Sequence, residues 1–264
     1  MVLPGQVHAQ PAAEIPQALR REYLNGLPAA QEYYLEQLVQ AGSCWILSQR
    51  SAAVGYAVVH DRALVEFYLT LPAQHHAPEL LETAMEASGA QRILCKSFDT
   101  LLLHAATDGS ARIESVGLLF RQITDPTCKL PPDLRMRPAA TDEWQAVAAI
   151  NDDFFDSDAE IQGLIQRGQL FLLERQQEML GCGIGQPVIE GAPHWDIGML
   201  VAAAHRQQGY GACIISWLKQ HHLQRGLQPI CGCSSDNTAS ARALYNAGFS
   251  CTHRLLDITR DQTS

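Results

Sequence analysis

The stretch from residue 198 to residue 218 constrains this chain most, because an apolar run passes through a glycine-bearing turn into an amphipathic helix. Gly209 and Gly211 lack a Cβ atom, so the backbone there can adopt strained dihedral angles and approach a ligand closely. The helix that follows presents unpaired N–H groups and the positive end of its dipole to an anion. The stretch therefore predicts a binding site for a ligand that carries phosphate.

Two motifs in this part of the chain occur in a recognisable order. Residues 206–211 read Arg-Gln-Gln-Gly-Tyr-Gly, and residues 236–249 contain Asn-Thr-Ala-Ser-Ala-Arg-Ala-Leu-Tyr-Asn-Ala-Gly-Phe. The first resembles the Arg/Gln-x-x-Gly-x-Gly/Ala turn of the GNAT superfamily of N-acetyltransferases. The second resembles its Asn-x-x-Ala-x-x-Leu-Tyr-x-x-x-Gly-Phe segment, with the Ala and the Leu-Tyr pair each one residue later than in that pattern. A lone glycine turn is a weak signal, because other nucleotide-binding folds also use one. The pair of motifs implies the GNAT fold, an α/β fold of the α+β kind around a mixed sheet.

The composition is that of a globular protein that binds neither nucleic acid nor membrane. The 264 residues are 47% hydrophobic and 18% charged, which suits one large or two ordinary domains. The 19 basic and 28 acidic side chains give a net charge of −9, whereas affinity for nucleic acid depends on a basic surface. No apolar stretch reaches the length of a membrane span. The acidic balance favours a cationic amine as substrate.

The eight cysteines predict free thiols rather than a metal site or a disulfide framework. They stand mostly beside apolar residues, with neither a Cys-x-x-Cys pair nor zinc-type histidine spacing. Residues 1–16 lack a basic region followed by an apolar run, so we predict no secretory signal. These features together predict a cytoplasmic protein without a bound metal.

The chain divides by pattern into two domains and a linker. Residues 1–15 are rich in Pro, Ala and Gln and predict a disordered lead-in. Residues 16–124 predict a first domain, and a cluster of prolines marks a linker at 125–133. Residues 134–264 predict the GNAT acetyltransferase domain, with the order β-α-α-β-β-β-α-β-α-β and a helix over 144–155.

The two halves of the chain form a weak internal repeat. Ile93–Asp99 parallels Ile230–Asp236, and the elements predicted for the first half follow the same order. Residues 71–78, between a strand and a helix, contain two prolines and no glycine. The first domain is therefore predicted to be a degenerate GNAT-like copy that has lost cofactor binding. This degenerate domain is predicted to bind no CoA of its own and to contribute a wall of the substrate pocket or the surface of a homodimer.

The resemblance implies acetyl-CoA as co-substrate and assigns residues to it. Backbone N–H groups of the glycine turn would hold the pyrophosphate, while Met199, Leu200 and Val201 would bind the pantetheine arm through their main chain. The N–H of Leu200 or Val201 would also donate to the oxyanion that forms during attack. Asn237 would both cap its helix and contact the cofactor. The turn residues assigned to the cofactor are Arg206, Gln207, Gln208, Gly209, Tyr210, Gly211 and Ala212.

The resemblance also assigns a general acid, whereas the general base stays open. Tyr245 takes the family's position for a cofactor contact that protonates the departing thiolate, with simple packing on its helix as the alternative. Asp196 is our choice for the base, with His194 and Glu190 as further candidates, although Asp196 and Glu190 could be solvated carboxylates. Cys182 could be the nucleophile of a ping-pong route, but a thiol in the core is the favoured interpretation.

These assignments predict an acyl-CoA-dependent N-acyltransferase. It would transfer acetyl from acetyl-CoA to a primary amine, in a small molecule or a peptide, by direct attack. One alternative is a catalytically silent acyl-CoA binding or sensing protein, and another is an interaction protein with a vestigial cofactor site. The acceptor amine does not follow from these motifs, because one fold hosts many acceptors.

Overall fold

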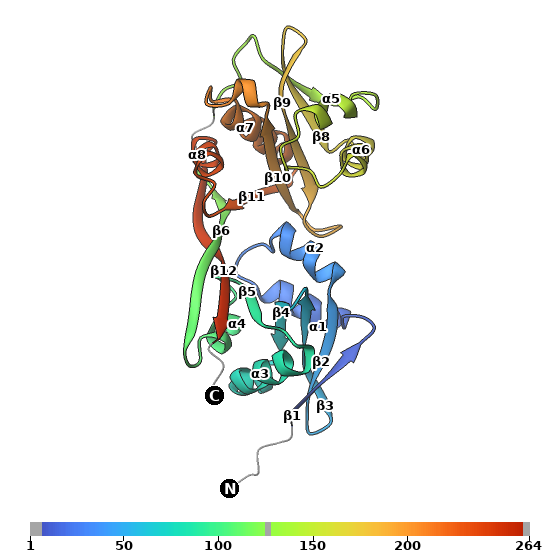
Figure 1. Cartoon of the computed structure of the whole chain (residues 1–264), viewed down its shortest axis with the longest axis vertical. Helices are drawn as coiled ribbons and strands as arrows, with labels where there is room; N and C mark the ends of the chain where they lie inside the picture. The colour runs from blue at the N-terminus through green and yellow to red at the C-terminus, as the bar shows by residue number, and fades with distance from the viewer. Residues whose placement is uncertain (1–6, 125–127, 261–264) are drawn as a thin grey trace. The chain divides into compact units, whose positions relative to one another are not determined.

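The computed structural model describes residues 7–124 and 128–260, and the chain divides into two compact units (Figure 1). The first unit consists of the described residues of Met1–Leu118 and His253–Ser264, and the second of those of Leu119–Thr252. Both boundaries fall inside strands, β6 (Ala111–Ile123) and β12 (Phe249–Arg260). The late strand β12 therefore contributes residues to the first unit as well as to the second.

The first unit has an α/β fold on a mixed sheet. Its strand order is β1-β2-β3-β4-β5-β12-β6, in which β1 to β4 pair antiparallel whereas β4 and β5 run parallel. Strand β12 pairs antiparallel with β5, with Leu255 opposite Lys96. The other elements of this unit are β1 (Val7–Ala12), α1 (Gln17–Gly26), α2 (Tyr33–Ala41), β2 (Ser43–Gln49), β3 (Ala52–His60), β4 (Ala63–Leu69), the 3-10 helix η1 (Leu71–His76), α3 (Ala77–Ser88), β5 (Arg92–Lys96) and α4 (Thr100–Ala106).

The second unit repeats this plan. Its strand order is β6-β11-β10-β9-β8-β7, with β10 and β11 parallel and the pairs from β7 to β10 antiparallel. The elements of this unit are β7 (Arg135–Pro138), α5 (Trp144–Ala149), α6 (Asp158–Gln166), β8 (Leu170–Arg175), β9 (Glu178–Pro187), β10 (His194–Val201), the 3-10 helix η2 (Ala203–His205), α7 (Tyr210–Leu223), β11 (Gln228–Ser234) and α8 (Thr238–Asn246). The mixed sheet and the α/β fold predicted from the sequence are confirmed.

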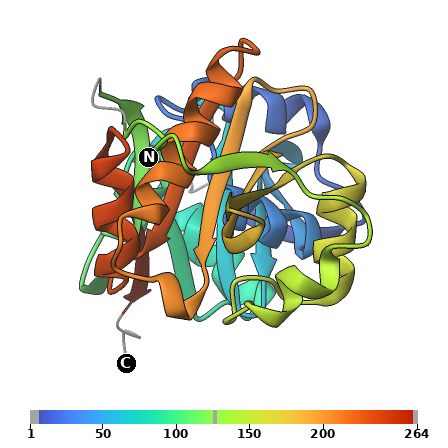
Figure 2. The same ribbon diagram turned by 90° about the horizontal axis from the view of Figure 1, so that it is seen from above.

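Helices cover both faces of the second unit's sheet, with α7 and α8 on one side and α5 and α6 on the other (Figure 2). Successive residues of β9 point to opposite faces. A Cβ atom at Gly183 would lie 2.5 Å from Ile214 of α7, whereas Cys182 and Ile184 belong to a buried cluster that includes Ile161 of α6. The side chains of the neighbouring strand β10 alternate between the same two faces.

Part of the predicted lead-in, residues 1–15, is a strand, so the prediction of disorder was wrong over Val7–Ala12. This segment is β1 and pairs antiparallel with β2 along its whole length. Its alternate side chains Val7 and Ala9 pack against the buried core of the first unit. Pro11 is tolerated because β1 is an edge strand. The Pro- and Ala-rich composition concealed this alternation, and residues 1–6 lie outside the described part.

The helix predicted over 144–155 is shorter in the structure. The Oδ1 atom of Asn151 accepts hydrogen bonds from the backbone N–H of Phe154 (3.1 Å) and Phe155 (3.0 Å). Its amide group donates to the carbonyl of Phe155 at 2.9 Å. Such side-chain bonds compete with helical ones and turn the chain. Residues 152–153 therefore lie in the loop between α5 and α6.

The predicted linker at 125–133 is described only in part. Residues 125–127 lie outside the described chain, and 128–134 form neither helix nor strand. The domain limits 16–124 and 134–264 stay a prediction, since the compact units divide within β6 and β12. Within residues 7–124 and 128–260, no helix is long and apolar enough to cross a membrane.

Candidate functional site

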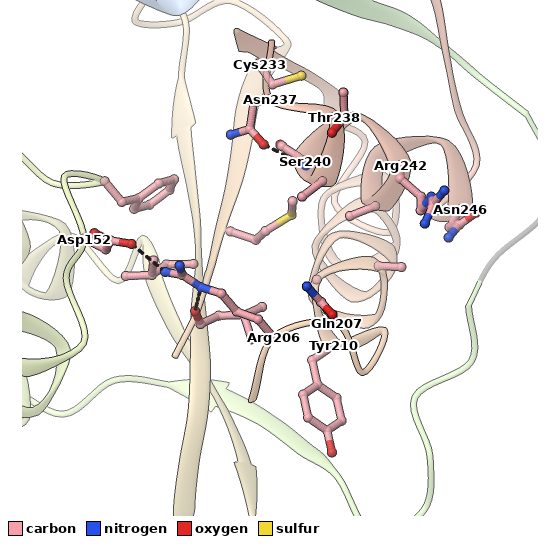
Figure 3. A pocket seen from close by; sticks show the side chains of 18 of the residues that line it. Asp152, Arg206, Gln207, Tyr210, Cys233, Asn237, Thr238, Ser240, Arg242 and Asn246 are labelled. Atoms are coloured by element: carbon pink, nitrogen blue, oxygen red, sulfur yellow. Dashed lines mark hydrogen bonds and ion pairs between the residues drawn. The ribbon is translucent and has the colours of Figure 1, made fainter. Parts of the chain in front are cut away.

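A cavity of about 1220 Å³ lies at the ends of β10 and β11 in the second unit (Figure 3). The two parallel strands pair over His194–Asp196 and Gln228–Ile230. Their later residues, 199–201 and 232–234, both line the cavity. The turn after β10, the start of α7, one face of α8 and the loop between α5 and α6 complete the lining. The space between the two strand ends suits an extended ligand.

The turn after β10 ends in a left-handed glycine. Gly209, the N-cap of α7, has a φ angle of 85°, which side chains with a Cβ rarely adopt. The first hydrogen bond of α7 joins the N–H of Cys213 to the carbonyl of Gly209 at 3.3 Å. The N–H groups of residues 210–212 therefore have no acceptor within the helix. Together with the dipole of α7 they make this end of the cavity suitable for an anion.

Gly211 differs from Gly209, because its φ angle is not in the left-handed region. A Cβ atom at Gly211 would lie 3.4 Å from the Cβ of Ala243 in α8 and 3.7 Å from the Cε of Met199, which are ordinary van der Waals distances. The backbone therefore requires a glycine at position 209, whereas neither backbone conformation nor packing requires one at position 211.

Arg206 connects the glycine turn to the loop between α5 and α6. Its Nη2 atom lies 2.8 Å from Oδ2 of Asp152, and its Nε donates to the carbonyl of Val201 at 3.2 Å. The side chains of Arg206 and Asp152 are 44% and 62% exposed. An exposed pair of this kind contributes only about 0.2 to 1 kcal/mol. A phosphate group could therefore displace Asp152 from Arg206.

Most of the residues assigned to the cofactor line this one cavity. Those that do are Met199, Leu200, Val201, Arg206, Gln207, Gly209, Tyr210, Gly211, Ala212 and Asn237. Asn237 caps α8, because its Oδ1 accepts from the N–H of Ser240 at 2.9 Å. Gln208 is not among the lining residues, and its Oε1 accepts from the hydroxyl of Tyr210 at 3.2 Å. The structure thus brings ten of the eleven turn, strand and cap positions together.

Tyr245 does not belong to the lining of the described cavity. Its ring packs edge-on against Phe120, with centroids 5.1 Å apart, and its side chain is 50% exposed. Arg242 and Asn246, four residues apart on α8, do line the cavity, whereas Tyr245 is turned about 100° from Asn246 around the helix axis. The role of general acid therefore stays a prediction that this geometry does not favour.

Asp196 lies on the face of β10 that looks toward the α5–α6 loop. The ring of Trp195 packs on His222 of α7, with centroids 5.2 Å apart, so the neighbouring Asp196 points to the other face. Gly198, on that same face, lies under Phe154 of the loop, because a Cβ there would be 3.0 Å from the ring. Asp196 is outside the cavity lining, so its role as base also stays a prediction.

The two other candidates for the base lie outside the cavity lining as well. Burial, and then the charge of Arg121, lower the pKa of His194, while a hydrogen bond with Gln228 opposes this shift. This shift favours the neutral imidazole, which is the form that can accept a proton. Glu190 is exposed in the turn between β9 and β10.

Several lining residues were missed by the sequence motifs. They are Asp152, Asp153 and Phe154 of the α5–α6 loop, His205 of η2, Gly232, Cys233 and Ser234 of β11, and Thr238, Ala239, Ser240, Arg242, Ala243 and Asn246 of α8. Arg242 and Asn246 lie four and eight residues after Thr238, so helical periodicity could have found them only from Thr238 and not from Asn237. Asp152 and Asp153 could not be found in this way, because the pattern placed them inside a helix.

Cys182 belongs to the core rather than to the cavity. It is fully buried in the cluster between β9 and α6, and burial raises the pKa of its thiol to about 12. This favours the core interpretation over a nucleophile. Among residues 7–124 and 128–260, no group of three or more His, Cys, Asp or Glu side chains could hold a metal ion.

Two family matches agree with this architecture. Residues 13–123 match a family described as acetyltransferase (GNAT) domain, and residues 135–249 match one described as acetyltransferase (GNAT) family. The chain is therefore a member of the GNAT acetyltransferase superfamily and carries two GNAT domains in tandem. No curated protein matches its sequence.

Solved structures show the same fold over nearly the whole chain. An acetyltransferase of the GNAT family from Colwellia psychrerythraea is 20% identical, with a TM-score of 0.85, covering 96% of this chain and 99% of that one. A GCN5-related N-acetyltransferase from Sphaerobacter thermophilus is 15% identical, with a TM-score of 0.64 and coverages of 98% and 97%. A tandem GNAT protein from the clavulanic acid biosynthesis pathway is 11% identical, with a TM-score of 0.61 and coverages of 98% and 100%. At these identities the likeness concerns the fold.

Proposed function

We propose that the second unit transfers an acyl group, acetyl in the first instance, from acyl-CoA to a primary amine. One observation carries the proposal: a single cavity joins the N-terminal N–H groups of α7 to the ends of β10 and β11. A phosphate-bearing head suits the helix end, and an extended arm suits the strand ends. Membership of an acetyltransferase family supports acyl transfer as the reaction.

Each part of acetyl-CoA has residues that would hold it. The N–H groups of residues 210–212 would bind the pyrophosphate, with Arg206 and Arg242 as the nearby cations of the lining. The strand end at 199–201 would run beside the pantetheine arm. An N–H of Leu200 or Val201 would donate to the carbonyl oxygen as it gains charge.

The acceptor we propose is a cationic amine. Asp152 and Asp153 place two carboxylates in the lining, and Phe154 beside them packs over β10. Carboxylates attract an ammonium group and can take its proton before attack. The net charge of −9 acts in the same direction. Asp152 and Asp153 are therefore better placed than Asp196 to act as the base.

We propose direct attack by the amine rather than a relay through the protein. The new N–C bond forms as the C–S bond breaks, and the departing thiolate takes a proton from solvent or a nearby group. A thiolate needs little help to leave, because a free thiol has a pKa of about 8.5. Cys233 is the cysteine that lines the cavity, but burial raises the pKa of its thiol, which disfavours the nucleophilic form.

Calorimetry with acetyl-CoA, followed by a screen of amines for CoA release, tests the proposal. Binding together with release for at least one cationic amine is the expected result, and Cys233→Ala should retain activity. If acetyl-CoA does not bind, the proposal is refuted.

The alternative is a catalytically silent acyl-CoA binding protein. The position of Tyr245 and Asp196 outside the cavity lining favours it, since both residues that the motifs assign to catalysis lie elsewhere. Tight binding of acetyl-CoA without turnover of any amine in the screen would establish this alternative.

A further inference from the structure

Two cysteines of the second unit stand in direct contact outside the cavity. The Sγ atoms of Cys128 and Cys213 are 3.0 Å apart, closer than two non-bonded sulfur atoms ordinarily come. Both are free thiols. The bond length of a disulfide is about 2.05 Å, so a relative shift of about 1 Å would join them.

A second contact holds the pair in place. The backbone N–H of Cys128 donates to the hydroxyl of Ser216 at 3.1 Å. Ser216 lies three residues after Cys213 on α7, so it is a neighbour on the same helix face. Cys128 is thus positioned on α7 by its main chain as well as by its sulfur.

We propose that Cys128 and Cys213 form a reversible disulfide that fastens residues 128–134 to α7. The oxidant is a peroxide or a small-molecule disulfide. With hydrogen peroxide, the sulfur of Cys128 attacks one oxygen and the O–O bond breaks. The departing hydroxide takes the thiol proton and leaves as water, so that Cys128 becomes a sulfenic acid. The sulfur of Cys213 then attacks that sulfur, the S–O bond breaks, and the hydroxyl departs as water with the proton of Cys213. Two thiols lose two electrons, and one peroxide becomes two waters.

The surroundings give the two thiols different parts in this reaction. Cys128 is partly exposed, whereas Cys213 is 6% exposed. Burial, and then the hydrogen bond with Cys128, raise the pKa of Cys213 to about 12. Cys128 therefore meets the oxidant first. The raised pKa disfavours the thiolate of Cys213, so its attack on the intermediate depends on the direct contact between the two sulfur atoms.

The link would restrain the helix that carries the anion end of the cavity. The N–H of Cys213 makes the first hydrogen bond of α7, to Gly209. The two cysteines are 85 residues apart in the sequence, so the closed loop is long and the unfolded chain loses much of its freedom. This inference is independent of the acyl-transfer proposal.

Peptide mapping of the full chain tests the disulfide. The protein is treated with hydrogen peroxide, the remaining thiols are alkylated under denaturing conditions, and the digest is examined by mass spectrometry. We expect a Cys128–Cys213 cross-link that dithiothreitol removes. Cys128→Ser should abolish it, and Cys44→Ser, a change at another buried thiol, should leave it intact. Alkylation of both residues after oxidation, or cross-links to other cysteines only, would overturn the proposal.

Urea unfolding measures the fastening itself. Oxidation should lower the unfolding equilibrium constant of the wild type on the order of 1,000-fold, as expected for a long closed loop. The partly exposed Cys128→Ser should fold normally and show no such change, so the test does not depend on the buried Cys213→Ser. An oxidised, cross-linked protein with unchanged stability would contradict the fastening.

Discussion

The central strands of the two units correspond position by position. In the first unit β4 and β5 run parallel with Leu64 opposite Ile93, and in the second β10 and β11 run parallel with Asp196 opposite Ile230. Five residues further along β4, Leu69 lies opposite Gly55 of β3. Five residues further along β10, Val201 lies opposite Gly181 of β9. The same backbone arrangement is therefore built twice.

These two glycines show how close the correspondence is. A Cβ atom at Gly55 would lie 2.0 Å from the carbonyl oxygen of Tyr68, and one at Gly181 would lie 2.4 Å from that of Leu200. In both units a neighbouring strand leaves no room for a side chain at this point. The difference between the units must therefore come from side chains and turns rather than from the course of the strands.

Corresponding positions carry opposite kinds of residue. Two residues after Leu64 on β4 the first unit has Glu66, and two residues after Asp196 on β10 the second has Gly198. Three residues after Ile93 on β5 the first unit has Lys96, and three residues after Ile230 on β11 the second has Cys233. Glu66 and Lys96 are 0% and 1% exposed. Cys233 lines the cavity. The first unit thus has buried charged side chains at the positions where the second has Gly198 under Phe154 and Cys233 at the cavity.

Gln31, in the loop between α1 and α2, bridges Glu66 and Lys96 in the first unit. Its Nε2 donates to Oε2 of Glu66 at 3.2 Å, and its Oε1 accepts from Nζ of Lys96 at 2.9 Å. Arg20 and Tyr56 also donate to Glu66, at 3.1 and 2.8 Å. In the second unit the corresponding loop, with Asp152 and Asp153, lines the cavity instead. A satisfied buried network thus takes the place that the cavity has in the second unit.

The turn that follows β4 in the first unit also differs from the turn that follows β10 in the second. After β4 the chain enters η1, Leu71–His76, with Pro72 in its first turn. After β10 it passes through η2 and reaches the left-handed Gly209 at the start of α7. The segment after β4 has no glycine at which the backbone could approach an anion closely. We therefore propose one acyl-CoA for each chain, bound in the second unit.

The largest effect should come from removing the cation at the centre of the buried network. Lys96→Met removes the hydrogen bond to Oε1 of Gln31 and the charge 3.9 Å from the buried Asp99. Asp99 then keeps the neutral donors Tyr23 and the N–H of Leu102. We expect the free energy of unfolding to fall by about 3 to 5 kcal/mol, as for the loss of one partner of a buried ion pair. Urea titration measures this fall. The control is Cys233→Ser at the corresponding position, which should cost about 1 kcal/mol or less; equal losses would mean that the two positions do not differ as described.

The next effect concerns the anion end of the cavity. Gly209→Glu forces a side chain into a left-handed position and adds a negative charge beside the expected pyrophosphate, so acetyl-CoA affinity should fall about 100-fold or more. Calorimetry gives the affinity. Gly109→Glu carries a similar strain, at a φ of 97° in the first unit, and should leave binding unchanged. Unchanged binding in Gly209→Glu would remove the basis for placing the cofactor here.

A smaller effect should separate the two roles of the α5–α6 loop. Asp152→Asn removes the partner of Arg206 and one carboxylate of the lining. We expect the KM for a cationic amine to rise about tenfold, from the loss of one charged hydrogen bond. The Kd for acetyl-CoA should fall slightly, because Arg206 becomes available to phosphate. Steady-state kinetics measures the KM and calorimetry the Kd, with the exposed Asp142→Asn as control. A weaker affinity for acetyl-CoA would contradict the idea that phosphate replaces Asp152 at Arg206.

The smallest effect is expected at Tyr245. Because its ring packs on Phe120 outside the cavity lining, Tyr245→Phe should lower turnover by less than about threefold, well below a typical contribution of general acid catalysis. Acetyl-CoA affinity should not change. A fall of about 100-fold in turnover, with normal affinity, would restore Tyr245 as the general acid.

The sequence predicted those parts of the site that depend on neighbouring residues. The glycine turn, the start of α7 and the cap by Asn237 are local backbone features, and all three are present in the structure. The contributions of Asp152 and Cys233 depend on which distant elements meet. A period-3.6 pattern cannot reveal that Asn151 ends a helix through its own side chain.

The fold was predictable to a similar extent. The order of elements in the second half follows from periodicity and turn residues, and it is confirmed. The membership of β12 in the first unit was not predictable, because it rests on pairs such as Leu255 with Lys96 that are far apart in the sequence. The network around Gln31 was missed for the same reason, since its members come from α1, β3, β4 and β5.

The position of β12 has a consequence for synthesis on the ribosome. Strand β5 is made early, yet its partner strand follows the whole of Leu119–Thr252. At 5 to 20 residues per second, β5 would wait roughly 10 to 30 s with that edge unpaired. An uncovered strand edge attracts other chains. The interval before β12 emerges is therefore the period in which the nascent first unit is most exposed to aggregation and most in need of a chaperone.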